Sequence, residues 1–370
     1  MRWMSFLVLL GAAVFDADSA VMWVGTASGE GSGIYRSELD LDSGAMTPPR
    51  LAAEIGGPGF LAQHPNGKVL YAACQLPGDA GGGVMAYSIS SGASTLSVLN
   101  SQPTGDGGAA HLAVDPSGRC LFTAQYGGGS VAVFPVLADG KVGPRSTLIE
   151  HEGSGPNRSR QEGPHPHWVG VGPKNEFLFV PDLGIDRVLI YRIDHENASI
   201  RPHGEAVCPS GGGPRHFKFH PSGKWAYVVN ELILAVTVFE YDAAAGALTP
   251  IQTIPALPEY YWQGFNSSSE IRVHPTGRFV YSANRGHDSV TVFAVDGQTG
   301  RLRFIEREAI RGAMPRNFNL DPGGRWLVAG GRESNSLTSF QVDQDSGALL
   351  YSRHFVSCPR PMCVLFQPTE

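Results

Sequence analysis

Polar and charged side chains stand at two fixed distances from a turn that recurs along this 370-residue chain. Six residues before the turn proline, or before its equivalent Pro173, the chain has Gly59, Ala110, His167, Arg215, Ser269 and Arg316. Ten residues after it, the chain has Gln75, Tyr126, Leu183, Glu231, Arg285 and Arg332. Guanidinium groups bind carboxylates and phosphates through paired hydrogen bonds, and a histidine exchanges a proton near neutral pH. Together these residue types predict a site for an anionic, oxygen-rich small molecule.

The turn belongs to a short pattern, often His-Pro-x-Gly before an apolar run, that occurs six times. The copies start at His64, Asp115, Gly172, His220, His274 and Asp321, which are 51, 57, 48, 54 and 47 residues apart. A period of roughly fifty residues with several short strands in each period is typical of a β-propeller blade. A proline and a glycine between two apolar runs favour a hairpin.

The copy at His220 shows how one blade is built. Residues 216–220 and 225–230 predict the first two strands, and residues 235–241 alternate as a third. Residues 249–254 predict a weaker fourth strand, whose Pro250 suits a sheet edge. One period therefore encodes four antiparallel strands.

The two ends of the chain together supply a seventh blade. Residues 22–26 and 33–40 resemble second and third strands, while residues 362–366 resemble a first strand. We therefore predict an all-β fold, a seven-bladed β-propeller with four antiparallel strands per blade and a ring closed by the N- and C-terminal strands. Residues 21–370 form a single domain in this prediction.

The repeat also predicts where the polar positions lie. The first strand of a blade lines the central channel, and the second strand is antiparallel to it. The start of strand one and the end of strand two therefore share one rim of the channel. One step away from the counted positions the chain has His111, Gln125, Asp182, Asn230, Glu270 and Asn284. The alternative is a solvated channel lined by ion pairs that bind nothing.

Composition limits the partners. The net charge of −6 and the isoelectric point near 6.1 argue against nucleic acid or an acidic membrane surface. Outside the N-terminus no apolar run is long enough to span a membrane. The five cysteines, Cys74, Cys120, Cys208, Cys358 and Cys363, form no Cys-x-x-Cys pair, so we expect mostly buried thiols, with one disulfide still possible.

The N-terminus has two interpretations. Arg2 precedes an apolar stretch over residues 6–15 and small residues at 17–20, which predicts a signal peptide over residues 1–20 with cleavage after Ser19 or Ala20. The mature protein is then periplasmic or secreted. Alternatively the stretch is an apolar leader that feeds the first strand, and the protein is cytoplasmic.

Several longer motifs carry a resemblance to a known family. They are His-Glu-Gly-Ser-Gly-Pro (151–156), Arg-Gln-Glu-Gly-Pro-His-Pro-His (160–167), Pro-Asp-Leu-Gly-Ile-Asp-Arg-Val-Leu-Ile-Tyr (181–191), Gly-Gly-Gly-Pro-Arg-His (211–216), Asn-Glu (230–231), Glu-Ile-Arg-Val-His-Pro-Thr-Gly (270–277) and Ala-Asn-Arg-Gly-His-Asp-Ser-Val (283–290). With them the chain resembles, over residues 21–366, the seven-bladed β-propeller lactonases of the 6-phosphogluconolactonase type, which are related to carboxy-cis,cis-muconate cyclase. The resemblance implies a carboxylic-ester hydrolase that opens a sugar-derived lactone.

The resemblance also implies four catalytic residues: His167, Arg215, Glu231 and Arg285. His167 or Glu231 would activate water, and the arginines would bind the oxyanion or the anionic part of the substrate. The counted positions and their neighbours add five expected substrate-binding residues: His111, Gln125, Asp182, Arg316 and Arg332. We expect a monomer that binds a lactone or another anionic sugar acid. No cofactor is expected, and no metal, because no metal-binding spacing is evident and neighbouring arginines disfavour a cation.

Two other functions remain open at this point. The first is a non-catalytic, extracytoplasmic interaction propeller, for which the aromatic segment 260–264 could form a binding loop. The second is a cyclase or isomerase that forms a lactone from a carboxylated diene, because ring closure needs the same handling of a carboxylate.

Overall fold

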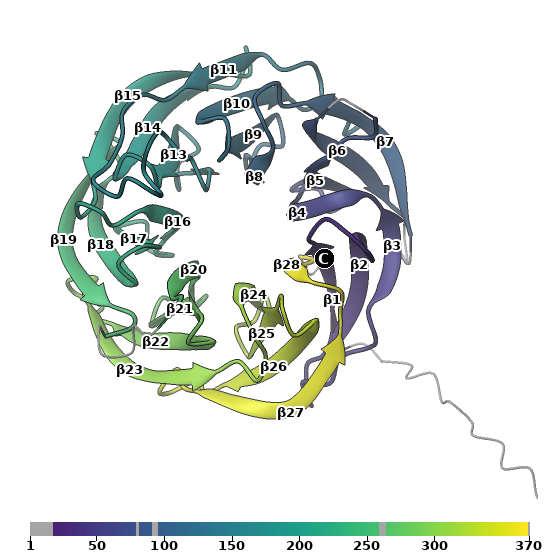
Figure 1. Ribbon diagram of the computed structural model, residues 1–370, viewed down its shortest axis with the longest axis vertical. Helices are drawn as coiled ribbons and strands as arrows, with labels where there is room; N and C mark the ends of the chain where they lie inside the picture. Colours follow the sequence, from purple (N-terminus) through teal and green to yellow (C-terminus); the bar gives the residue numbers. More distant parts are fainter. Residues whose placement is uncertain (1–17, 79–80, 91–94, 259–263, 369–370) are drawn as a thin grey trace, which may run out of the picture.

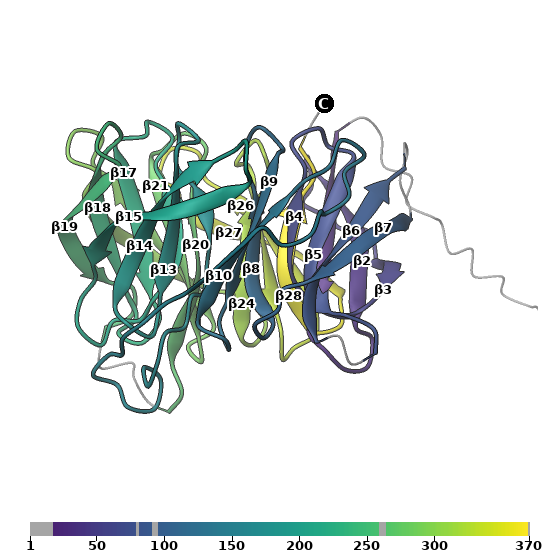
Figure 2. The same ribbon diagram turned by 90° about the horizontal axis from the view of Figure 1, so that it is seen from above.

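The computed structural model describes residues 18–78, 81–90, 95–258 and 264–368. In these residues, 28 strands form seven four-stranded sheets that are arranged in a ring (Figure 1). Seen from the side, the strands run between the two faces of the ring (Figure 2). The predicted seven-bladed all-β propeller is confirmed. Among the described residues there is no helix long and apolar enough to cross a membrane.

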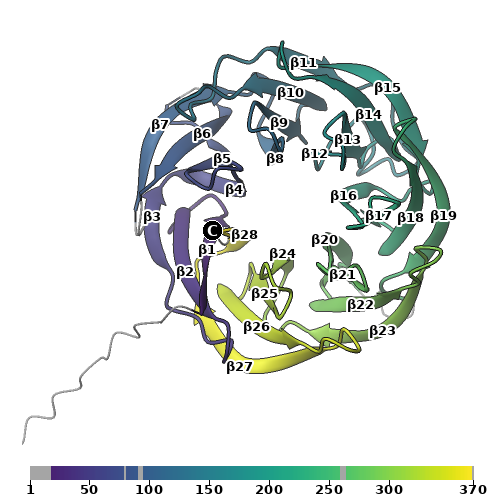
Figure 3. The same cartoon turned by 180° about the vertical axis from the view of Figure 1, so that it is seen from behind.

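Each blade is a meander whose first strand lies innermost, as the view from behind also shows (Figure 3). The blade that closes the ring consists of β28 (Pro361–Phe366), β1 (Ser19–Thr26), β2 (Gly33–Asp40) and β3 (Arg50–Glu54). The next two are β4 (Gly56–Gln63), β5 (Val69–Gln75), β6 (Gly82–Ile89) and β7 (Leu96–Pro103), then β8 (Ala109–Val114), β9 (Cys120–Gln125), β10 (Ser130–Pro135) and β11 (Thr147–Glu150). The fourth and fifth are β12 (Gly170–Val171), β13 (Phe177–Asp182), β14 (Arg187–Asp194) and β15 (Ser199–Val207), then β16 (Pro214–Phe219), β17 (Trp225–Asn230), β18 (Ala235–Asp242) and β19 (Ala247–Pro255). The last two are β20 (Ser267–Val273), β21 (Phe279–Arg285), β22 (Ser289–Val295) and β23 (Leu302–Ala309), then β24 (Pro315–Leu320), β25 (Trp326–Gly331), β26 (Ser336–Val342) and β27 (Leu349–Ser357).

The two ends of the chain close the ring as the sequence predicts. Strand β28 pairs antiparallel with β1, with Phe366 opposite Met22 and Val364 opposite Val24. Strand β1 starts at Ser19, and Ser19 lies opposite Asp40 in β2. Cleavage after Ser19 or Ala20 would therefore remove the first one or two residues of β1. Residues 1–17, which make up most of the expected signal peptide, lie outside the described residues, so that cleavage stays a prediction.

The repeated turn also links neighbouring blades. Nε2 of His220 lies 3.0 Å from the carbonyl oxygen of Gly277 in the next turn, and Nε2 of His274 lies 2.9 Å from that of Gly324. Both glycines have positive φ, and a Cβ atom on either would lie about 2.5 Å or less from the histidine ring that packs on it. These repeat histidines are thus explained by blade packing.

Candidate functional site

A β-bulge near the start of several first strands turns selected side chains toward the channel. In β16, Pro214 lies opposite Asn230 and His216 opposite Val229, so Arg215 is an extra residue in the strand. The same irregularity makes Ala110 extra in β8 and Arg316 extra in β24. A bulge breaks the strict alternation of a strand and re-aims the side chains beside it. The bulged residues are those that lie six positions before the turn proline.

These positions surround one cavity of about 200 Å³ at one end of the channel. It is lined by Gly59, Phe60, Ala109, Ala110, His167, Arg215, His216, Arg316 and Met362. Five of its lining residues are therefore counted positions from five different blades. Ser269, the sixth, is buried, and its carbonyl oxygen accepts a hydrogen bond from Arg215.

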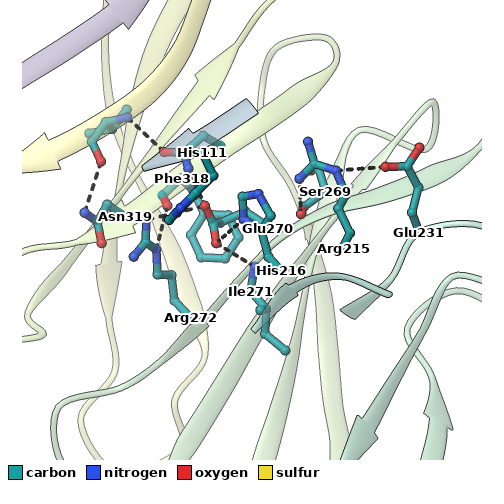
Figure 4. A network of polar contacts seen from close by, with 12 residues as sticks. His111, Arg215, His216, Glu231, Ser269, Glu270, Ile271, Arg272, Phe318 and Asn319 are labelled. Atoms are coloured by element: carbon teal, nitrogen blue, oxygen red, sulfur yellow. Dashed lines mark hydrogen bonds and ion pairs between the residues drawn. The ribbon is translucent and has the colours of Figure 1, made fainter. Parts of the chain in front are cut away.

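Beside this cavity, the carboxylate of Glu231 forms ion pairs with three guanidinium groups. Its Oε2 lies 2.8 Å from Nε of Arg215 (Figure 4), and its Oε1 lies 3.0 Å from Nη2 of Arg285 and 2.7 Å from Nη2 of Arg160. Burial alone would raise the pKa of Glu231, but the positive charges of Arg285 and Arg215 lower it below its ordinary value. Glu231 is therefore a permanent carboxylate that holds the arginines in place.

His167 lines the same cavity and is neutral at pH 7. Burial, together with the charge of Arg215, holds the pKa of His167 well below its ordinary value. Its Nδ1 atom is buried and makes no hydrogen bond to any described residue. The ring lies edge-on to Tyr126 and to His216, with ring centroids 5.3 Å away in both cases. His165 does not pair with it, since Nδ1 of His165 lies 2.8 Å from the carbonyl oxygen of Tyr126.

A second carboxylate, Glu270 on β20, is buried and contacts His216, which lines the cavity. Nδ1 of His216 lies 3.0 Å from Oε1 of Glu270, and Nη2 of Arg272 lies 3.4 Å from Oε2 (Figure 4). Glu270 also accepts hydrogen bonds from the backbone N–H of Ile271, at 3.0 Å, and from the side-chain amide of Asn317. Its four partners hold this carboxylate in one orientation.

The remaining expected arginines and His111 lie around these two clusters. Arg316 lines the cavity, and among the described residues its guanidinium makes no hydrogen bond or ion pair; burial and the charge of Arg285 lower its pKa to about 10. Arg332 is half-buried and pairs with Glu333 at 3.2 Å. His111 lies deeper in the channel, where its ring centroid is 4.0 Å from that of Phe60.

The structure places two expected substrate-binding residues in supporting roles instead. In the orientation that gives both its amide nitrogen and its amide oxygen a hydrogen-bond partner, Gln125 donates to the carbonyl oxygens of Ser130, at 3.0 Å, and Thr123, at 2.9 Å. Asp182 accepts from the backbone N–H of His165 at 2.7 Å, and its other oxygen lies 2.7 Å from Nδ1 of His151. Because these contacts occupy both side chains, we leave Gln125 and Asp182 out of the substrate-binding set proposed below.

Two residues of the site were missed by the sequence analysis. Arg160 lies on the long connection between β11 and β12. This connection does not belong to the repeat, so counting from the turn cannot predict where Arg160 lies. Its motif, residues 160–167, was the only signal. His216 follows Arg215 directly, and a regular strand would turn it away from the cavity.

A possible metal cluster is accounted for by hydrogen bonds. Ligand atoms of Asp115, Cys120 and His195 lie within 4.8 Å of one another. The carboxylate of Asp115, however, accepts hydrogen bonds from the backbone N–H groups of Ser117, Arg119 and Cys120, and from the side chain of Asn175. These contacts stabilise the repeated turn. All five cysteines are buried free thiols.

Known proteins share this fold and much of this sequence. The family described as lactonase, 7-bladed beta-propeller, matches residues 21–366. A 6-phosphogluconolactonase of Bacillus subtilis is 39% identical over 345 residues, which cover 93% of this chain and 97% of that protein. The crystal structure of a periplasmic gluconolactonase from Pseudomonas aeruginosa superposes with a TM-score of 0.88 at 31% identity, over 95% of this chain and 100% of that one. The chain therefore belongs to the seven-bladed β-propeller lactonase family.

Proposed function

We propose that this protein hydrolyses a sugar-derived lactone in the cavity at the end of the channel. The observation that carries the proposal is the pairing of an arginine cluster with neutral histidines on one small cavity. Ester hydrolysis needs a base that accepts a proton from water and fixed donors for the oxyanion that forms. The cavity offers both.

The size and charge of the cavity indicate the substrate class. Pockets for drug-sized ligands measure roughly 300–1,000 Å³, so a cavity of about 200 Å³ suits a single-ring molecule. Arg316 faces the cavity without an acidic partner among the described residues, so positive charge is left for the ligand. A polyhydroxylated lactone, plain or phosphorylated, meets both conditions.

The residues divide into three roles. Arg316 and Arg215 supply donors for the oxyanion or for an anionic substituent. Glu231 positions Arg215 and Arg285; three guanidinium partners make it a poor proton acceptor, which argues against its use as the base. A neutral histidine takes the proton from water, and both His167 and His216 face the cavity in this state.

The two named relatives suggest different substrates. One is called a 6-phosphogluconolactonase and the other a periplasmic gluconolactonase. If the N-terminal segment directs export, we expect the plain lactone, because sugar phosphates are retained in the cytoplasm. N-terminal sequencing of the natively expressed protein tests the export step; an intact Met1 would contradict it.

The decisive assay measures acid release from a panel of plain and phosphorylated aldonolactones by purified protein at constant pH. Spontaneous hydrolysis in buffer and in heat-denatured protein gives the baseline. We expect at least one lactone to be opened far above that rate. A folded protein that accelerates none of them contradicts the proposal, and the interaction and cyclase alternatives then become the ones to test, the latter with a carboxylated diene.

A further inference from the structure

We infer that His216, oriented by Glu270, is the general base that activates water in this cavity. The inference rests on the proposed lactone hydrolysis and assigns its proton acceptor to His216, a residue that the repeat did not place on the channel rim, with Glu270, which it did. His216 and Glu270 come from neighbouring blades, on β16 and β20, so the ring itself brings them together.

Glu270 fixes the orientation of the His216 imidazole. Glu270 is fully buried, its carboxylate forms an ion pair with Arg272, and its oxygens accept hydrogen bonds from Ile271 and Asn317. Nδ1 of His216 lies 3.0 Å from it (Figure 4). In neutral His216 the proton is therefore on Nδ1, and Nε2 carries the free electron pair.

The Nε2 atom of His216 has no partner among the described residues of the fold. His216 is only 2% exposed, lines the cavity, and its Nε2 atom makes no hydrogen bond to any described residue. A buried acceptor without a partner costs free energy unless water or a ligand satisfies it. His216 lines the cavity beside Arg215 and Arg316, so a water that reaches Nε2 would come from that cavity. This is the arrangement of base, orienting carboxylate and oxyanion donors that acyl transfer requires.

The two rival bases lack one part of that arrangement. His167 has no carboxylate within ion-pair distance among the described residues, so nothing fixes its tautomer. Glu231 is fixed, but its three guanidinium partners oppose protonation. Of these three described residues, His216 alone lines the cavity with both a fixed tautomer and an unpaired nitrogen.

Charges around His216 keep it neutral before the reaction. Burial is the largest cause that holds its pKa well below the ordinary value, and the positive charges around it act in the same direction. The titratable and charged groups that face it are Arg215, Lys218, Arg272, Arg316, His111, His167 and Glu270. The carboxylate of Glu270 opposes this shift and stabilises the imidazolium once the proton has arrived.

The proposed step balances. The oxygen of water attacks the lactone carbonyl carbon while one of its protons passes to Nε2 of His216, and the carbonyl electrons move to the oxygen. When this oxyanion collapses, the ring C–O bond breaks and the imidazolium returns its proton to the departing alkoxide oxygen. Lactone and water have then given the hydroxy acid, and His216 is neutral again.

The test compares three variants of the full chain on a lactone that the wild type hydrolyses: His216→Gln, Glu270→Gln and His167→Gln. We expect kcat to fall by about 10²–10⁴-fold in His216→Gln, as for loss of a general base, and by more than about tenfold in Glu270→Gln, whose amide no longer fixes the tautomer. His167→Gln should lose less than either. Calorimetric affinity for the hydroxy acid product should change little in His216→Gln, because the arginines that bind it remain.

Two further measurements separate chemistry from structure. Added imidazole should partly restore kcat in His216→Ala, which a purely structural role would not allow. In the wild type, nitrogen NMR of labelled histidine should show His216 protonated on Nδ1 at pH 7, and this reading needs no variant to fold. Full activity in folded His216→Gln, or a proton on Nε2, overturns the inference. Absence of lactonase activity in the wild type overturns the proposed function instead, so the two failures are distinguishable.

Discussion

Glu231 and Glu270 are two buried carboxylates on adjacent blades whose partners differ. Glu231 contacts three guanidinium groups, and Glu270 contacts one guanidinium, one imidazole, a side-chain amide and a backbone N–H. Each is at most 3% exposed. Burial is therefore the same for both, and the partners alone decide what each carboxylate can do.

The different partners give the two carboxylates different roles: Glu231 balances charge, and Glu270 supports proton transfer. Around Glu231 all three partners are guanidinium groups, which do not exchange protons near neutral pH. Around Glu270 the partner is a histidine, which can take up a proton and return it. We therefore expect changes at Glu231 to act first on stability and binding, and changes at Glu270 to act first on kcat and its pH dependence.

The largest effect should come from Glu231→Ala. Removal of one member of a buried ion pair leaves uncompensated charge and costs about 3–5 kcal/mol of the free energy of unfolding. Here three guanidinium groups would face one another, and we expect no measurable activity. Urea unfolding measures the loss. The matched control is Glu308→Gln, which breaks the more exposed pair with Arg311 and should cost less than about 1 kcal/mol. Equal losses in the two variants would contradict the role given to Glu231.

Substitution of Arg316 tests whether this guanidinium, which forms no ion pair with a described residue, binds the substrate. Loss of one oxyanion donor costs about 10²–10³-fold in kcat, and we expect Arg316→Ala to fall in this range with little change in stability. Arg316→Lys should recover only part of the activity, because an ammonium does not reproduce the planar donor pair. Arg332→Ala, which loses a pairing with exposed Glu333, is the control and should have the weaker effect. A larger effect in the control would move the oxyanion site toward Arg332.

The sequence predicted the fold almost completely because the propeller repeats itself. Six copies of the turn fixed the number and order of strands, and the two incomplete patterns at the termini fixed the closure of β28 on β1. Counting from the same turn predicted that His167, Arg215 and Arg316 share one rim of the channel, and all three line the cavity. A repeat gives each strand a defined position, so counting from the turn is enough.

Counting failed where local geometry departs from the repeat. The bulge at Arg215 brings both this residue and His216 to the cavity, and no residue type in the sequence marks that extra position. Arg160 comes from an irregular connection, so its contact with Glu231 depends on how that segment folds back. Gln125 lies next to a counted position, but its side-chain amide forms its hydrogen bonds with Thr123 and Ser130 of its own sheet.

Acid should weaken the fold through the histidines before it affects Glu231. The pKa values of His111, His167 and His216 are held well below the ordinary value, chiefly by burial, so the unfolded chain binds protons first as the pH falls below about 6.5. The free energy of unfolding should then fall by up to about 1.4 kcal/mol per pH unit for each histidine. Glu231, with a lowered pKa, contributes stability that is lost only below the ordinary pKa of a glutamate, about 4.3.

Urea unfolding between pH 7.5 and 5 isolates the histidine effect, and His111→Gln should make the slope shallower. A free energy of unfolding that rises on acidification in this window would show that these imidazoles are charged in the fold.

The smallest effect should come from Arg160→Ala, which asks whether Glu231 needs all three of its partners. The Arg160 side chain is 35% exposed, so water screens its charge more than those of Arg215 and Arg285, whose side chains are 2% and 10% exposed. Such a pair contributes up to about 1 kcal/mol, which corresponds to about fivefold in kcat/KM. The control is Arg158→Ala, an exposed arginine on the same connection, which should leave kcat/KM unchanged. If Arg160→Ala were as damaging as Glu231→Ala, the Arg160 pair would be as important as the two buried pairs. The connection between β11 and β12 would then be an essential part of the Glu231 cluster.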